Sequence, residues 1–561
     1  MTSPRPATAI DAIAEDYLAS LLPLSPTLAT EIGLPGYDDQ WDDFSPAGQQ
    51  ALADLARQAL ARLDGVEPVD DVDRVTVAAM RERLGVDLDR HAAGWAHGDL
   101  NVLNSPLQSI RDVFEVMPQE SADDAAVIAR RLHGVPAALA TYTEALRERA
   151  AAGTLCARRQ VEKCIKQAQE AAGEASSFKA VEPLAGRLEG AAAQELLDGI
   201  EVARGDFAQL AADLADLLPA ARERDGVGEE AYRLALRTFL GADVDAREAH
   251  AWGIEELARI DAEQQRVARL LFPGASVAQT IERLNNDPAR QLHGTKALQE
   301  WMQQVSDASI AALNGTHFDI PEQLHRLECR IAASGTGGIY YTPPSADFSR
   351  PGAMWWSVPP GEETFVTWQE KTTVYHEGVP GHHLQLGTAV ALGDQLNSWR
   401  RLVCWVSGHG EGWALYAERL MEELGFLSDP GDYFGMLDSQ RLRAARVVLD
   451  TGVHLGLDVD PSLEKAGLMP GGVGKVWDAD VAWAFLRHNV AMADAFLRFE
   501  LDRYLGFPGQ APSYKLGERL WLELREQCQQ REGAGFDLKG FHSRALALGG
   551  VGLDVLREAL Q

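Results

Sequence analysis

The stretch Tyr375-His-Glu-Gly-Val-Pro-Gly-His-His-Leu-Gln385 is the most informative part of this sequence. It contains three histidines, His376, His382 and His383, and Glu377 stands beside the first of them. Catalytic zinc sites use imidazole and carboxylate ligands and keep one position open for water. A glutamate next to a zinc-binding histidine can then act as general base. The stretch therefore predicts a zinc hydrolase, and the alternative is a group of histidines with structural roles.

The spacing of these histidines differs from the usual zinc-binding helix, in which two histidines lie four residues apart. His382 follows His376 by six residues and His383 follows it by seven. On an unbroken helix, His382 would point about 120° away from His376, and His383 would lie about 10.5 Å along the axis. Pro380 and Gly381 favour a break, since proline lacks the N–H donor and glycine allows unusual backbone angles. We expect the break to bring His382 to the metal and leave His383 for substrate; an unbroken helix would favour His383 as the ligand.

A third metal ligand is expected in the segment Ser407-Gly-His-Gly-Glu-Gly-Trp413. Glu411 has glycines on both sides, which indicates a close backbone approach, and it opens an Ala- and Leu-rich helix. The helix dipole favours a carboxylate at that end. His409 is an alternative ligand, and an ordinary first-turn glutamate is the alternative for Glu411. Glu418 lies seven residues further on, on the same helix face, and either supports a ligand or is a solvated carboxylate.

Most of the chain has the apolar spacing of amphipathic helices, for example at 207–218. The pattern predicts a mostly α-helical protein that forms one large domain over 1–561, with a helical N-terminal half at about 1–320 and a catalytic half at about 321–561. Helices are expected through about 120–270, again from about 366, and then at about 410–424, 433–455 and 477–505, with two more after a sharp loop at 506–512.

The pattern changes between about 325 and 365 to short alternating segments. Leu327-Glu-Cys-Arg-Ile331, Ile339-Tyr-Tyr-Thr342 and Ala353-Met-Trp-Trp-Ser-Val358 are typical of short strands, and a glycine-rich break at 335–338 separates the first two. They predict a small β-sheet beside the His-Glu helix. Such a sheet either presents an exposed strand edge with which a peptide can pair or is a plain structural hairpin.

Composition limits the classes of partner. The chain has 561 residues, 46% of them hydrophobic, and a formal net charge of −31. The negative charge argues against nucleic acid and against an anionic membrane as partners. The five cysteines are few and scattered, which suits a reducing compartment. No apolar run reaches the ~18 residues of a membrane span, and the first residues lack an apolar signal segment. We expect a cytoplasmic protein.

Several motifs occur together in this chain, at 341–352, 376–385, 410–418, 446–454, 503–504, 508–515 and 536–542. Together they resemble the DUF885 family of bacterial proteins, which is related to gluzincin-type zinc peptidases such as the angiotensin-converting-enzyme and carboxypeptidase Taq groups. The resemblance covers nearly the whole chain. It implies a mostly helical zincin-like fold, one zinc ion per chain held by His376, His382 and Glu411, and Glu377 acting on metal-activated water.

Further residues are candidates for contacts with a reaction intermediate. Arg446, Asp450 and His454 recur at four-residue steps along one helix face. They form either a structural hydrogen-bond ladder or a row that presents His454 to the tetrahedral intermediate, with Asp450 orienting the ring. The hydroxyl of Tyr514 is expected to donate to a developing oxyanion.

Contacts with substrate are expected from five residues. Arg503 or Lys515 could pair with the terminal carboxylate of a peptide. Tyr341 and Arg350 belong to the motif at 341–352, and His383 is left free by the predicted helix break. For each residue taken singly, a surface cation or a packed aromatic ring is the alternative.

Taken together, the sequence predicts a zinc metallopeptidase that acts on short peptides. A zinc hydrolase of another amide or ester uses the same chemistry and is the first alternative. The second is a non-catalytic peptide-binding protein that keeps the fold, although retention of the histidines, Glu377 and Glu411 argues against it. The expected partner is a short peptide or another small amide.

Overall fold

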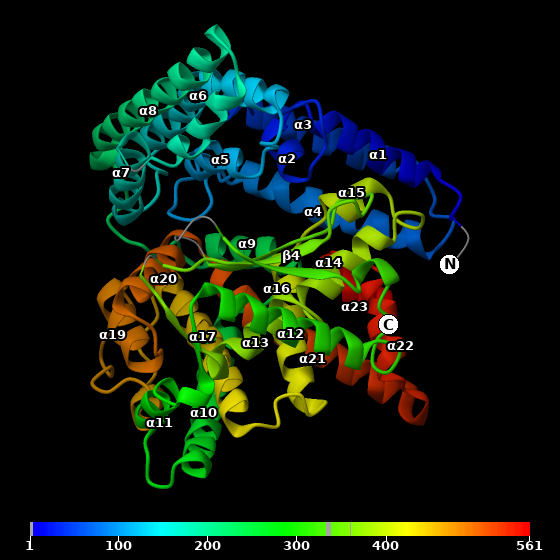
Figure 1. Cartoon of the computed structure of the whole chain (residues 1–561), viewed down its shortest axis with the longest axis vertical. Coiled ribbons are helices and arrows are strands. Elements are labelled where there is room, and N and C mark those ends of the chain that lie inside the picture. The colour runs from blue at the N-terminus through cyan, green and yellow to red at the C-terminus, as the bar shows by residue number, and fades with distance from the viewer. Residues whose placement is uncertain (1–3, 175, 333–337, 360) are drawn as a thin grey trace.

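The computed structural model describes residues 4–174, 176–332, 338–359 and 361–561. It is mostly helical with two small sheets (Figure 1), which confirms the expected mostly α class with a small sheet beside the His-Glu helix. The first helices are α1 (Ala9–Leu21), α2 (Pro26–Glu31), α3 (Pro46–Leu63), α4 (Asp71–Ala92), α5 (Pro106–Asp112), α6 (Ala122–Ala151), α7 (Arg158–Ala172) and α8 (Ala191–Leu217).

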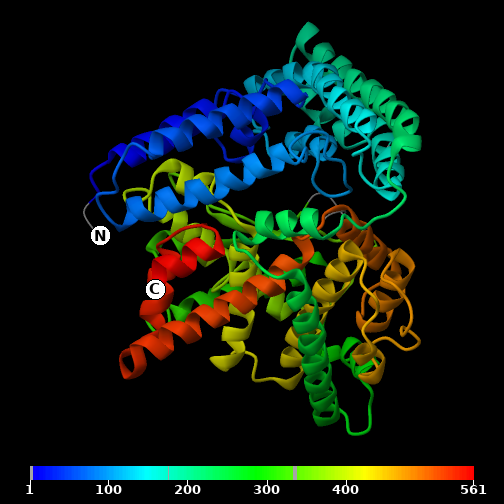
Figure 2. The same cartoon turned by 180° about the vertical axis from the view of Figure 1, so that it is seen from behind.

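The N-terminal helices form a layer on one side of the C-terminal helices, with α6, α7 and α8 at one end of that layer (Figures 1 and 2). Residues between 100 and 221, with Phe44, enclose a hydrophobic cluster of their own. Helices α1, α3 and α4 instead contribute to the large cluster that continues into the C-terminal helices. The expected division into halves at about 320 stays a prediction.

The remaining helices build the body that carries the His-Glu stretch. Helix α17 runs through its middle and is buried along nearly its whole length. It begins after Asp429, whose side chain accepts hydrogen bonds from two backbone N–H groups, and it ends at Gly456 in the left-handed region (φ 63°). These helices are α9 (Glu229–Leu240), α10 (Ala246–Leu271), α11 (Val277–Asn285), α12 (Thr295–Leu313), α13 (Thr367–Glu377), α14 (His382–Ala391), α15 (Ser398–Leu402), α16 (Ser407–Glu423), α17 (Pro430–Leu455), α18 (Pro461–Lys465), α19 (Ala479–Asn489), α20 (Asp494–Gly506), α21 (Gln510–Glu532), α22 (Leu538–Leu546) and α23 (Leu553–Leu560).

The predicted strands are confirmed. In the larger sheet, β2 (Leu327–Ile331) runs parallel to β4 (Gly352–Trp356), and β3 (Ile339–Thr342) pairs with the other side of β4 in antiparallel fashion. A second sheet joins β1 (Gln291–His293) to β5 (Thr364–Val366). Within the described residues β3 has no second neighbour, so one of its edges is open. Most of the glycine-rich break predicted at 335–338 lies outside the described residues.

Two predictions about the C-terminal helices are wrong. The helix expected at 477–505 is two helices, because the chain leaves α19 at Asn489, whose carbonyl accepts a hydrogen bond from Arg441 Nε at 2.8 Å. After the loop near 507–509 come three helices where we expected two. The segment between α22 and α23 is glycine-rich, and Gly549 takes a positive φ of 66° that ends the helical run.

Candidate metal centre

The helix break predicted at Pro380-Gly381 is confirmed. Helix α13 ends at Glu377 and α14 begins at His382, and the Val379–Pro380 peptide bond is cis. A Cβ on Gly381 would lie 1.9 Å from the carbonyl oxygen of His376, so the tight return of the chain requires glycine. The indole of Trp413 donates to the carbonyl of Pro380 at 2.9 Å, which fixes the break against α16.

The break brings His382 to the same place as His376 and Glu411. The Nε2 atoms of the two histidines lie 3.3 and 3.5 Å from one Glu411 oxygen, and one ligand atom from each residue falls within 4.8 Å of the others. The two rings are nearly perpendicular, at 88°. Ligand atoms bound ~2.0–2.2 Å from a tetrahedral zinc ion would be about 3.3–3.6 Å apart. This donor set therefore fits a divalent metal such as zinc.

Glu418 supports the first of these histidines. Its carboxylate accepts from His376 Nδ1 at 2.8 Å, from Thr372 Oγ1 at 2.6 Å and from Ser439 Oγ at 3.3 Å. Glu418 is buried, so it is not a solvated surface carboxylate. Metal-binding histidines usually donate their other ring N–H to a carboxylate, which fixes the tautomer and the ring orientation. Glu418 has the position of such a partner.

Replacing Glu418 by glutamine is expected to weaken zinc binding about 10- to 100-fold, because the amide supports the His376 ring less well than a carboxylate does. Competition with a chelator measures the zinc dissociation constant. Glu422→Gln, at an exposed position of the same helix, is the matched control and should bind zinc like the wild type. Equal affinities in the two variants would show that Glu418 does not support a ligand.

Glycines place Glu411 where α16 crosses α21. A Cβ on Gly412 would lie 2.5 Å from the carbonyl carbon of Gly517, so the two backbones meet without side chains between them. A Cβ on Gly410 would meet the ring of Trp405 at 1.9 Å. The close backbone approach expected from the glycines beside Glu411 is confirmed.

Glu377 lies in the same buried region and forms no hydrogen bond to any residue that the structure describes. Burial raises the pKa of its carboxyl, and the negative charge of Glu411 adds to this, whereas His376 and His382 oppose it. A carboxylate that neighbours a metal-binding histidine without being tied to other groups can accept a proton from water.

The comparisons with known proteins confirm the DUF885 part of the resemblance found in the sequence. The profile of the family described as bacterial proteins of unknown function, DUF885, matches residues 26–560. The chain belongs to the DUF885 family.

Two solved structures share the fold of this DUF885 protein. A "putative lipoprotein" from Colwellia psychrerythraea has 22% sequence identity and a TM-score of 0.83, with 98% of each chain covered. A "putative lipoprotein of unknown function" from Shewanella oneidensis has 17% identity and a TM-score of 0.73, with 98% of this chain and 99% of that one covered. No curated protein matches the chain. Among the described residues, no helix has the length and apolar character of a membrane span.

His383 does not face a substrate in the DUF885 protein, contrary to our expectation. Its side chain is fully buried, Nδ1 lies 2.9 Å from the hydroxyl of Tyr341, and Nε2 lies 2.9 Å from the carbonyl oxygen of Leu324. Burial lowers the pKa of His383 to about 4, so the ring is neutral. Tyr341, also predicted as a substrate contact, uses its hydroxyl to hold this ring. The pair ties strand β3 to helix α14.

Lys515 and Arg503 are also occupied, which corrects their predicted role with a terminal carboxylate. Lys515 is 1% exposed, and its Nζ lies 2.6 Å from Glu518 and 3.0 Å from Glu256. Arg503 pairs with Glu500 at 3.1 Å and donates to Gln510 at 2.7 Å. Neither cation is left for a substrate.

Tyr514 lies beside two arginines, and its predicted role as oxyanion donor stays a prediction. The Arg446 guanidinium lies 5.0 Å from the centre of the Tyr514 ring, and that of Arg503 lies 6.0 Å from it. Burial raises the pKa of the Tyr514 hydroxyl, and the charge of Glu411 raises it further. The two arginines restrict the position of the Tyr514 ring.

The row on α17 is the structural ladder and not a catalytic row. Asp450 accepts from the hydroxyl of Tyr232 at 2.7 Å and from the Gly509 N–H at 2.9 Å. His454 is buried, stacks on Tyr232, and places Nε2 2.9 Å from the carbonyl oxygen of Tyr504. The predicted contact of His454 with an intermediate is therefore not supported.

Among the described residues, neither His409 nor Arg350 belongs to the converging group of His376, His382 and Glu411. The alternative ligand His409 is buried, and its Nδ1 lies 2.8 Å from the carbonyl oxygen of Val551. Arg350 is exposed in the loop between β3 and β4. Trp405 had no sequence signal: its ring is 43% exposed and lies 6.4 Å from that of His382, so it forms an apolar surface beside the centre.

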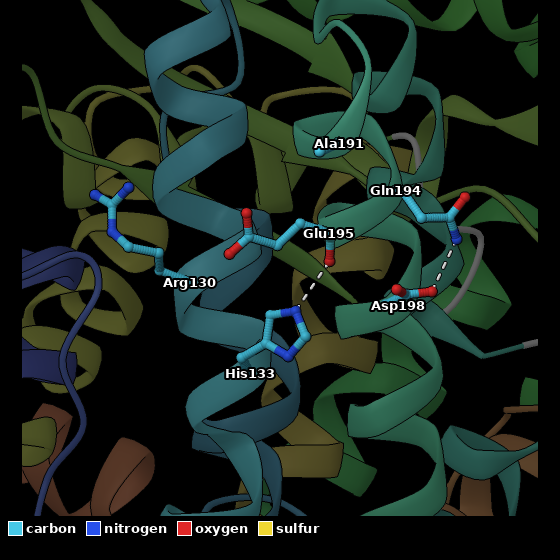
Figure 3. Close-up of a pocket in the computed structure, with 6 residues that line it drawn as sticks. All are labelled: Arg130, His133, Ala191, Gln194, Glu195 and Asp198. Atoms are coloured by element: carbon cyan, nitrogen blue, oxygen red, sulfur yellow. Dashed lines mark hydrogen bonds between the residues drawn. The ribbon is translucent and has the colours of Figure 1, made fainter.

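An open surface cavity of about 640 Å³ lies elsewhere, between α6 and α8 (Figure 3). In it the His133 ring meets the backbone carbonyl of Glu195 at 3.0 Å, and the Gln194 side chain donates to Asp198 at 2.8 Å. Both helices belong to the separate N-terminal hydrophobic cluster, and the cavity shares no residue with the metal centre. It is lined by Arg130, His133, Ala191, Gln194, Glu195 and Asp198.

Proposed function

We propose that this protein is a zinc-dependent hydrolase, and specifically a metallopeptidase of short peptides with a gluzincin-like arrangement. The observation that carries the proposal is the convergence of His376 Nε2, His382 Nε2 and a Glu411 oxygen, with the carboxylate of Glu377 beside them. Two imidazoles and a carboxylate are a ligand set of catalytic zinc sites. The carboxylate next to the first ligand supplies the base that hydrolysis requires.

Each residue then has a defined task. His376, His382 and Glu411 would hold the ion, and Glu418 fixes the ring of His376. Zinc, when bound, polarises a carbonyl group and lowers the pKa of water. Glu377 takes the proton from the attacking water and returns it to the leaving amine.

The hydroxyl of Tyr514 donates a hydrogen bond to the carbonyl oxygen of the substrate as negative charge develops there. The guanidinium of Arg446 stacks on the Tyr514 ring and restricts its orientation. A donor that is positioned in advance does not need to reorganise during the reaction, which is what makes such groups effective.

The open edge of β3 favours a peptide as substrate. The Ser357 N–H donates to the carbonyl of Gly338 at 3.2 Å, so in the alternating antiparallel ladder the backbone groups of Ile339 and Tyr341 point away from β4. An extended peptide can pair with these groups. Because Tyr341 is tied to His383, next to His382, a peptide paired there would run past the metal centre.

Metal analysis and a peptide library test this function together. The purified protein should carry about one zinc ion per chain and should cleave members of a short-peptide library. Cleavage should stop with a chelator and return with added zinc. Zinc without cleavage of any peptide, but with turnover of other amides or esters, would favour the alternative hydrolase. Binding without turnover would favour a peptide-binding protein.

The location remains a proposal as well. We propose the cytoplasm, on the scattered cysteines and the charge of −31. The two solved structures carry lipoprotein names, so membrane attachment is the competing location. Fractionation of cells that express the natural gene separates the two, since a lipoprotein sediments with membranes.

A further inference from the structure

Arg443 differs from the other arginines of helix α17. Arg441 pairs with Asp261, and Arg446 pairs with Glu500 at 2.7 Å. Arg443 forms no ion pair with any described residue. Within the described part of the chain, its one hydrogen bond is a long one, 3.4 Å from Nη1 to the carbonyl oxygen of Ser439 in its own helix, and its buried Nε has no partner there.

Its neighbours on the helix place Arg443 beside the metal centre. One turn earlier, the hydroxyl of Ser439 donates to Glu418, the carboxylate that supports His376. One turn later, Arg446 stacks on Tyr514. Arg443 therefore lies between the support of the first ligand and the expected oxyanion donor.

Electrostatic interactions with the carboxylates of the metal centre also indicate that Arg443 lies beside it. The positive charge of Arg443 acts on the carboxylate of Glu377. Arg443 likewise acts on Glu418. The Arg443 guanidinium therefore lies near the carboxylates of Glu377 and Glu418, but it forms an ion pair with neither of them.

A partly buried guanidinium without an anion is unfavourable, because it loses hydration without gaining a charged partner. The planar guanidinium group presents its N–H donors in a fork that matches the two oxygens of a carboxylate. In Arg443 this fork is nearly unused. A carboxylate supplied by a ligand would satisfy it.

We propose that Arg443 binds a carboxylate group of the substrate next to the metal centre. The inference rests on the proposed hydrolase function and narrows its substrates to anionic peptides. Arg443 thereby takes the role that we predicted for Arg503 or Lys515, both of which are already paired. The carboxylate is either the free C-terminus of the peptide or an acidic side chain close to the cleaved bond.

Three matched tripeptide libraries separate these sources. The first ends in a free carboxylate, the second in a neutral amide, and the third in an amide with Asp or Glu as last residue. The wild type should cleave the first or the third about 10- to 100-fold better than the second, as expected for one charge-assisted contact. The library that is preferred identifies the source, and equal cleavage of all three overturns the proposal.

Arg443→Gln should remove this preference. Its kcat/KM for carboxylate peptides should fall about 10- to 100-fold, to the level of the neutral amides, which should change little. Arg443→Lys keeps the charge without the fork and should retain part of the preference. Arg487→Gln is the control for loss of one charge, because Arg487 is 56% exposed on α19. A loss that is equal for carboxylate and amide peptides would mean that Arg443 is structural.

A binding measurement keeps the test independent of turnover. Glu377→Gln protein loaded with zinc should retain carboxylate peptides from the libraries on ultrafiltration in preference to amides. The double variant with Arg443→Gln should not. If no peptide is cleaved but this difference is found, the peptidase proposal fails while the Arg443 site stands. If both proteins retain the libraries equally, the Arg443 site is refuted.

Discussion

Replacing Glu377 by glutamine is expected to lower peptide hydrolysis about 10²- to 10⁴-fold while the bound zinc remains. Glutamine has nearly the same shape but cannot accept a proton from water. The residues expected to hold the metal are His376, His382 and Glu411, and Glu377 makes no hydrogen bond to a described residue that the change would break. Zinc content by metal analysis and kcat/KM on a cleaved library peptide check the two halves of the prediction.

Glu363→Gln is a suitable control, because this change also removes one negative charge and Glu363 is exposed in the segment before β5. It should keep both zinc and activity. Near-normal turnover in Glu377→Gln would exclude Glu377 as the base. Loss of zinc in that variant would instead indicate that Glu377 is itself a ligand.

The features of the metal centre that depend on the backbone angles of proline and glycine could be predicted from the sequence. Proline and glycine restrict or widen backbone angles wherever they occur, so Pro380 and Gly381 indicate a helix break without knowledge of the rest of the fold. The glycines around Glu411 indicate close approach in the same way, and the structure supplies the partner, Gly517. The strands before the His-Glu helix could be predicted for a similar reason, because the alternation of residues that indicates a strand is a local property of the sequence.

The roles of single polar side chains could not be predicted, because their partners are distant in the sequence. His383 is held by Leu324 and Tyr341, which belong to a short 3-10 helix and a strand far upstream. Lys515 is neutralised by Glu256 from α10. Such pairings arise only when helices from different parts of the chain pack together. The same reason separates Arg443 from the paired arginines of α17, which are indistinguishable from it in the sequence.

The row Arg446, Asp450 and His454 shows where periodicity stops being informative. The four-residue spacing correctly places the three side chains on one helix face. Whether that face meets a cleft or other helices depends on tertiary packing. Here the hydroxyl of Tyr232 in α9 and the backbone N–H of Gly509 both donate hydrogen bonds to Asp450. A ladder and a catalytic row have the same sequence pattern, so only the structure distinguishes them.

The two adjacent histidines are expected to respond in opposite ways to replacement. His382→Ala removes an imidazole that points at Glu411 from 3.5 Å, and should weaken zinc binding by more than about 100-fold, beyond what loss of an outer partner costs. His383→Ala should bind zinc almost normally. It removes contacts to Leu324 and Tyr341, so its free energy of unfolding should fall by about 1–3 kcal/mol for each buried group left without a partner.

Zinc dissociation constants from chelator competition, together with urea unfolding of the zinc-free proteins, separate these effects. The reason for the contrast is geometric: the break after Glu377 turns His382 toward His376 and turns His383 toward the sheet. His376→Ala serves as the reference for loss of a ligand and should match His382→Ala. Tighter zinc binding in His382→Ala than in His383→Ala would mean that His383 is the second ligand and that the helix break does not serve the metal.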